Sequence, residues 1–114
     1  MSKRPAVLLI EDIWEAIEKI ERYTSGMPRK SFEEDEKTTD AVVRNLEIIG
    51  EAANRLPDSF KGEHSEIEWI KIIGLRHRIV HEYFGVDLGI IWEIIQRDLP
   101  AVKQQLRDIR KSSK

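Results

Sequence analysis

Apolar residues recur every three or four positions along most of this chain, and this spacing restricts the fold more than any other feature. On a helix of 3.6 residues per turn such positions form one stripe, which has to be buried. The chain lacks the strict apolar–polar alternation that is typical of half-buried strands. The pattern therefore predicts an all-α protein, an antiparallel helical bundle of four to five helices.

Four apolar stripes predict four long helices, which lie within residues 10–20, 41–56, 65–84 and 87–109. The stripe of the second helix is too wide for one neighbour, so we expect this helix to be packed between two others. Gly50 and Gly74 lie inside the second and third helices, where glycine costs about 1 kcal/mol relative to alanine. We expect these two helices to cross closely near the glycines, because close packing would offset that cost.

Local signals predict where the helices begin and end. Residues 31–34 and 65–68 have the Ser-x-x-Glu pattern of a capping box, which predicts a helix start at each. Residues 25–28 should end the first helix, and Pro57 should end the second, with a loop from there to His64. Gly85 should end the third helix and Asp87 should cap the fourth. Pro100 should kink or restart that last helix, because proline removes a backbone donor.

Composition limits the classes of protein that fit. The 114 residues are enough for a single domain, residues 1–114, with its own core. No cysteine is present, which excludes disulfides and thiolate metal sites and favours a cytoplasmic location. The longest early apolar stretch, residues 6–10, is too short for a membrane span. The net charge of −2 provides no overall field that would attract nucleic acid.

Charge is nevertheless uneven along the chain. Residues 33–36 are all acidic, whereas residues 71–81 contain three basic residues and two histidines without any acid. Such runs are usually solvated helix faces. The basic run differs because it coincides with the segment GLRHRIVHEYFGVD (74–87), which holds two of the three histidines of the chain.

Three interpretations of this cluster are open. His77 and His81 are four residues apart on one helix face, a spacing that can chelate zinc, but the third ligand would have to be His64 or a carboxylate. Arg78 occupies the position where a zincin motif requires glutamate. A histidine among long apolar residues can also be an ordinary core side chain. The third interpretation is phosphate chemistry, in which Arg76 binds a phosphate and His81 transfers a proton.

The third interpretation coincides with a family resemblance. Arg76-x4-His81-x-Tyr83 resembles the R-x4-H-x-Y motif of the HEPN superfamily, specifically that of HepT-like toxins. The segments AVVRNLEIIGEAANRLP (41–57), WIKIIGLRHRIVHEYFGVD (69–87) and IIWEIIQRDLP (90–100) are similar to characteristic segments of that family, in the same order. One departure concerns His77, because the family more often has asparagine or another small polar residue after the arginine.

The resemblance implies a homodimer in which the motifs of both subunits face one cleft. It implies a metal-independent endoribonuclease toxin that needs no cofactor, with Arg76 and His81 as the catalytic pair and RNA as substrate. The implied partner is an antitoxin with a minimal nucleotidyltransferase (MNT) fold, which uses ATP and magnesium. Such an antitoxin can transfer AMP to the motif tyrosine, here Tyr83. His77 and Arg78, with Lys71 one turn before Leu75, are candidates for phosphate contacts.

Arg44 and Glu51 on the second helix allow two interpretations. Together with Glu47 and Arg55 they have the spacing of a simple ion ladder. Alternatively, Arg44 or Glu51 orients the motif from the neighbouring helix. An alternative to the ribonuclease function is also open: the chain could be a non-catalytic subunit that binds RNA or nucleotide and pairs with a nucleotidyltransferase. A purely structural dimer would leave the motif unexplained.

Overall fold

The computed structural model describes residues 4–82 and 88–112, apart from the side chains of residues 76–82 and 112. All regular secondary structure in these two ranges is helical. The elements are α1 (Ala6–Thr24), α2 (Arg29–Glu34), α3 (Glu36–Arg55), α4 (Asp58–Glu63), α5 (Trp69–Glu82), α6 (Leu88–Glu93), the π-helical turn η1 (Ile94–Asp98) and α7 (Leu99–Ser112). The predicted all-α class is confirmed.

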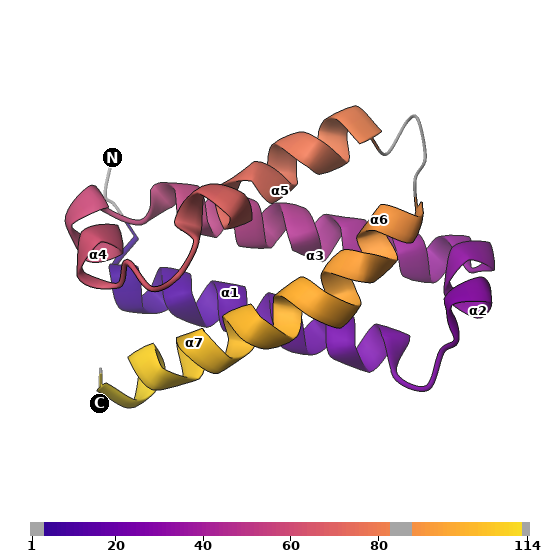
Figure 1. The fold of residues 1–114 in the computed structure, drawn as a ribbon, viewed down its shortest axis with the longest axis horizontal. Coiled ribbons are helices and arrows are strands. Elements are labelled where there is room, and N and C mark those ends of the chain that lie inside the picture. Colours follow the sequence, from indigo (N-terminus) through magenta and orange to yellow (C-terminus); the bar gives the residue numbers. More distant parts are fainter. Residues whose placement is uncertain (1–3, 83–87, 113–114) are drawn as a thin grey trace.

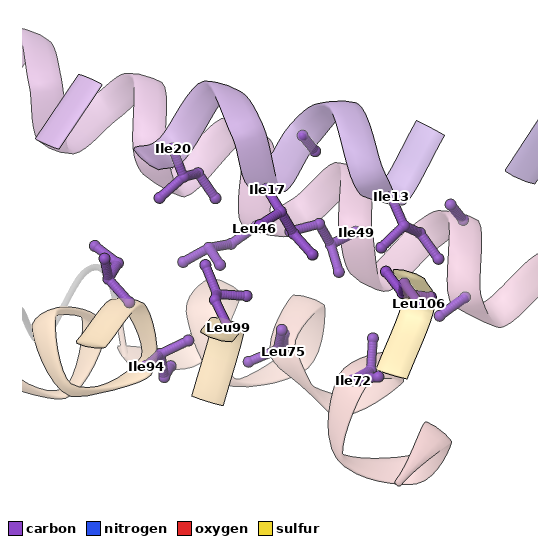
Figure 2. Close-up of a cluster of buried hydrophobic side chains, with 14 of the residues drawn as sticks. Ile13, Ile17, Ile20, Leu46, Ile49, Ile72, Leu75, Ile94, Leu99 and Leu106 are labelled. Atoms are coloured by element: carbon purple, nitrogen blue, oxygen red, sulfur yellow. The ribbon is translucent and has the colours of Figure 1, made fainter. Parts of the chain in front are cut away.

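The four long helical segments alternate in direction, as Figure 1 shows for α1, α3, α5 and the final α6–η1–α7 segment. Helix α3 packs against both α1 and α5, so the expected position between two neighbours is confirmed. The helices form two layers, with α1 and α3 on one side of the core and α5, η1 and α7 on the other (Figure 2). No helix in the described ranges is long and apolar enough to cross a membrane.

The core consists of the stripes that the periodicity predicts. Each layer contributes buried aliphatic side chains, and Figure 2 shows them meeting between the layers. Fully or almost fully buried examples are Ile13, Ile17, Ile20, Leu46, Ile49, Ile72, Leu99 and Leu106. Burying a side chain of this size contributes about 1.5–3 kcal/mol, so these stripes supply most of the driving force for the bundle.

The predicted ends of the first two long helices are confirmed. Helix α1 ends at Thr24, and Gly26 has a φ of 75°, a left-handed conformation that glycine adopts without strain. Helix α3 ends at Arg55, two residues before Pro57.

Both predicted capping boxes are wrong. Helix α2 begins at Arg29 after Pro28, so Ser31 lies inside it rather than before it. Helix α5 begins at Trp69, and its first backbone bond runs from the N–H of Ile72 to the carbonyl of Glu68. Neither Ser-x-x-Glu pattern therefore caps a helix: α2 starts directly after Pro28, and the indole N–H of Trp69, the first residue of α5, donates to the carbonyl of His64.

The side chain that caps the long helix α3 is Asp35, inside the acidic run. One carboxylate oxygen accepts from the backbone N–H of Thr38 at 3.1 Å and the other accepts from the Thr38 hydroxyl at 2.9 Å. The hydrogen bond from the Thr38 N–H, followed by that from its hydroxyl, lowers the pKa of Asp35 below the ordinary value of 3.8.

We expect Asp35→Ala to lower the melting temperature at pH 7 by about 3–6 °C, because α3 loses its cap. The pKa of Asp35 is lower in the folded protein than in the unfolded chain. The stability that its carboxylate adds is therefore fully present above pH 3.8, and it is lost as the pH falls through the folded-state pKa. The difference in melting temperature between the parent and Asp35→Ala should therefore disappear in acid. Asp35→Asn, which caps without ionising, is the control, and its gap from Asp35→Ala should not depend on pH. A pH-independent gap between parent and Asp35→Ala would contradict the ionic cap.

The expected loop between Pro57 and His64 is a short helix instead. Helix α4 occupies Asp58–Glu63, and the N–H of Lys61 bonds to the carbonyl of Pro57 at 3.1 Å. Proline is favourable at the start of a helix because its missing N–H has no partner there. Pro57 therefore both ends α3 and starts α4.

The glycine and proline predictions for the later helices have different outcomes. A Cβ on Gly74 would meet nothing within 4 Å, so the expected close approach at this position is wrong, although α3 and α5 do pack together. Gly50 is buried on α3. The last helix restarts at Leu99 after η1, as Pro100 predicts, with the N–H of Leu99 bonded to the carbonyl of Ile94 five residues earlier. Gly85 and Asp87 lie outside the described residues.

Candidate functional site

Arg76 and His81 of the motif lie on the second half of α5. The backbone is helical through Glu82, so Arg76, His77, Arg78 and His81 are all placed on one continuous helix. On an ideal helix, positions 76 and 81 are about 140° apart, so they flank a face rather than share a stripe. The side chains of these residues, and Tyr83 as a whole, lie outside the described structure.

Positions 77 and 81 share a face of α5 with Ile70 and Gly74, because the four are spaced by four, three and four residues. Ile70 is 89% exposed, and the space beside Gly74 is open. This face of α5, which we call the histidine face, is therefore uncovered where the structure describes its side chains.

The opposite side of α5 faces the core and a shallow groove. Ile72 and Leu75 are buried, and the groove between α5, η1 and α7 has a volume of about 150 Å³. Lys71 lines this groove, where its ammonium group lies 3.4 Å from the carboxylate of Glu68. Lys71 is thus on a different side of α5 from the histidine face. Position 78, seven residues later, is on the same side of the helix as Lys71.

Arg97 lies across this groove from α5 and was not among the residues that the sequence singled out. It belongs to η1, its side chain is largely exposed, and its Nε lies 3.2 Å from Glu93. In the sequence Arg97 is only a basic residue three positions before Pro100. The fold is what places it across the groove from Lys71.

His64 does not fit the third ligand of a metal site. Its ring packs against that of Phe60 in a tilted arrangement with centroids 4.6 Å apart, and its backbone carbonyl accepts from the indole N–H of Trp69 at 3.0 Å. It is therefore fixed before the first residue of α5, whereas position 77 is about 12 Å farther along the helix axis than Trp69. Among the side chains that the structure describes, no three His, Asp or Glu residues gather at a metal-binding distance.

The ion-ladder interpretation of the second helix is confirmed for one pair. Glu51 and Arg55 are 3.2 Å apart on the outer side of α3. Arg44 is exposed on the same side and lines a groove of about 400 Å³ between α1 and α3. Whether Arg44 or Glu51 also orients the motif depends on side chains of α5 outside the described set.

The basic end of the chain is largely used for packing. The guanidinium of Arg110 lies 4.2 Å from the ring centre of Trp14 and donates from Nη2 to Glu11 at 3.0 Å. The hydrogen bond to Glu11 raises the pKa of Arg110. Lys103 also lies over Trp14 and reaches Glu21 at 2.6 Å. These contacts join α7 to α1, so both side chains stabilise the bundle.

Comparison with known proteins supports one family. The model of the family described as ribonuclease HepT-like matches residues 13–109. A protein of Thermococcus cleftensis named "Probable ribonuclease HepT" is 43% identical over 102 residues, which cover 90% of this chain and 93% of the relative. A candidate RNase of Caldanaerobacter subterraneus subsp. tengcongensis is 39% identical over 105 residues, covering 92% and 94%. No solved structure gives a significant match.

Proposed function

The chain belongs to the HepT-like ribonuclease family, and from this premise we propose that it is an RNA-cleaving toxin, a metal-independent endoribonuclease. The observation that carries the proposal is the family match along 13–109, together with the complete motif Arg76-x4-His81-x-Tyr83 in its expected place. The helical backbone of α5 through Glu82 supports it, because Arg76 and His81 then belong to one helix.

Each motif residue has a chemical role in this proposal. RNA carries its own nucleophile, the 2′-hydroxyl, and His81 removes its proton as general base. Arg76 stabilises the negative charge that develops on the non-bridging oxygens of the phosphorane transition state. A second acid protonates the leaving 5′-oxygen, for which His77 or the His81 of a second subunit is available. Lys71 and Arg78 contact neighbouring phosphates.

A homodimer is part of the same proposal. The histidine face is uncovered beside Ile70 and Gly74, and a second subunit facing it would bring two motifs to one cleft. We place α5 and the last helix near the two-fold axis. A cytoplasmic location, suggested by the lack of cysteine, also belongs to the proposal.

The experiment that tests the activity is cleavage of RNA by the purified protein alone. Cleavage that survives EDTA supports the metal-independent enzyme. The alternative is a non-catalytic subunit that binds RNA or nucleotide, since arginine and histidine bind phosphate without cleaving it. Binding of RNA without cleavage would favour that alternative and overturn the proposed enzyme.

Regulation is proposed to occur at Tyr83, through an MNT-type antitoxin that uses ATP and magnesium. The phenol, with an ordinary pKa of about 10, is neutral and needs a base from the antitoxin to attack the α-phosphorus of ATP. The new bond joins the tyrosine oxygen to AMP, pyrophosphate leaves, and the proton passes to the base. The added phosphate and adenosine, two residues from His81, would repel and obstruct RNA.

We expect incubation with the antitoxin, ATP and magnesium to add AMP at Tyr83, as seen by intact-mass and peptide spectra. Tyr83→Phe should escape the modification. If Tyr83→Phe remains toxic when the antitoxin is present, modification is the operative control, whereas a neutralised Tyr83→Phe protein points to complex formation. AMP at another residue, or none, would rule out this regulation.

A further inference from the structure

Among the described residues, the outer face of the α1–α3 layer forms a second open surface. In Figure 2, α5, η1 and α7 lie on one side of this layer. On its other side, α1 and α3 border the groove of about 400 Å³, whose apolar lining comes from Leu9, Ile48 and Ala52. Leu8, which is 41% exposed, lies on the same side of α1 as Asp12 of this groove.

Charges along the outer side of α3 follow a definite order. Five positions spaced by three or four residues share this side, namely Asp40, Arg44, Ile48, Glu51 and Arg55. Four of them line the groove with α1. Their charges run negative, positive, neutral, negative, positive. Read from the other end, every charge is replaced by its opposite, so the stripe is complementary to an antiparallel copy of itself.

We infer that this groove is an interface with a second copy of the chain, in which α3 packs antiparallel on α3 of the partner subunit. The two-fold axis passes between positions 47 and 48. Arg44 then lies level with Glu51 of the partner subunit, each about 5 Å along the helix from the axis. Asp40 lies level with Arg55 of the partner subunit, about 11 Å from it. Symmetry makes each contact occur twice.

The charge order fixes direction and register more than it supplies affinity. A parallel pairing in the same register would bring like charges together, so the stripe disfavours it. Glu51 and Asp40 already make contacts within the chain, including the 3.2 Å pair of Glu51 with Arg55. A carboxylate accepts several hydrogen bonds, so an arginine of the partner subunit adds to these contacts.

The energy of the interface depends on the apolar residues of the groove and on the residues beside the two-fold axis. Exposed ion pairs alone are weak, so burial of the half-buried Ile48 and of Leu8 has to supply most of the association energy, because Leu9 and Ala52 are already buried within the subunit. The two Glu47 carboxylates approach each other beside the axis, which is unfavourable. This interface is separate from the histidine face, and a chain that uses both surfaces assembles beyond a dimer.

Charge reversal tests the pairing. We expect Arg44→Glu and Glu51→Arg each to halve the mass of the assembly in a light-scattering concentration series, or to weaken association at least about 10-fold. The double variant Arg44→Glu/Glu51→Arg restores opposite charges across the axis and should recover the parental mass. Arg29→Glu, which breaks a comparable i,i+4 pair with Glu33 outside the groove, should leave the mass unchanged.

Two further measurements sharpen the test. Raising the salt concentration should weaken the parental assembly, and Glu47→Gln should strengthen it. Unchanged mass in both single variants overturns the interface, and a double variant that stays dissociated overturns the antiparallel register. The inference does not depend on RNA cleavage, so inactive protein with the expected masses supports the interface while refuting the enzyme. Loss of cleavage by Arg44→Glu at unchanged mass would instead assign Arg44 to orienting the motif.

Discussion

Replacing His81 by alanine is expected to abolish RNA cleavage, with a rate at least about 100-fold below that of the parent protein. A positioned general base contributes about 10²–10⁴-fold, and no other histidine occupies the same position of the motif. The substitution lies in the last turns of α5, beyond the buried residues Ile72 and Leu75. The fold should therefore survive, and melting within a few degrees of the parent would show it.

Arg76→Ala should be as damaging as His81→Ala, because a lost donor to the transition state costs about 10²–10³-fold. Arg76→Lys keeps the charge but not the fork of donors, so it should recover only part of the activity. Lys71→Ala serves as the matched control on the same helix. It removes a charge on the groove side that is already paired with Glu68, and should lower activity only modestly.

The outcome that contradicts this assignment is cleavage that persists in both alanine variants. Activity that EDTA abolishes and zinc restores would instead identify the metal interpretation, with His77 and His81 as ligands. In that case the third ligand has to come from outside the loop that holds His64, because this residue is fixed by Phe60 and Trp69.

The fold was predictable because burial is periodic. The stripes of α1 and α3 contain the residues that are buried, and the wide stripe of α3 correctly indicated two neighbours. Helix ends were less predictable because several local signals compete. Ser31 and Ser65 both offered a cap, yet Pro28 precedes α2, and Asp35 caps α3 from within a run that looked only like solvated charge.

The candidate site was predicted in a different way. Its residues were proposed from a motif, and the fold shows that Arg76 and His81 lie on one helix. What the sequence could not provide is the relation between helices. The positions of Arg97 opposite Lys71, and of Arg44 beside α1, depend on how distant segments pack. Periodicity assigns a residue to a face but does not state which element that face meets.

Phe32 is a second residue whose packing partner the sequence did not reveal, and in this case the contact stabilises the fold. The sequence placed it in a polar capping pattern, but it is 0% exposed, and its ring centre lies 5.2 Å from that of Trp92. The short helix α2 packs against both α3 and α6. Phe32 is the buried residue of this six-residue helix, so one side chain attaches α2 to the start of the final helical segment.

Phe32→Ala should therefore lower the free energy of unfolding by about 3–5 kcal/mol, because it removes a large buried ring and leaves a cavity. For a domain of this size that corresponds to a fall in melting temperature of about 10–20 °C. Phe32→Leu, which refills most of the space, should cost only about 1 kcal/mol. Tyr23→Ala, at a ring that is 40% exposed on α1, is the control and should change the melting temperature far less. Equal melting of Phe32→Ala and Tyr23→Ala would mean that α2 unfolds separately from the bundle, and that α6 is held in place by other contacts.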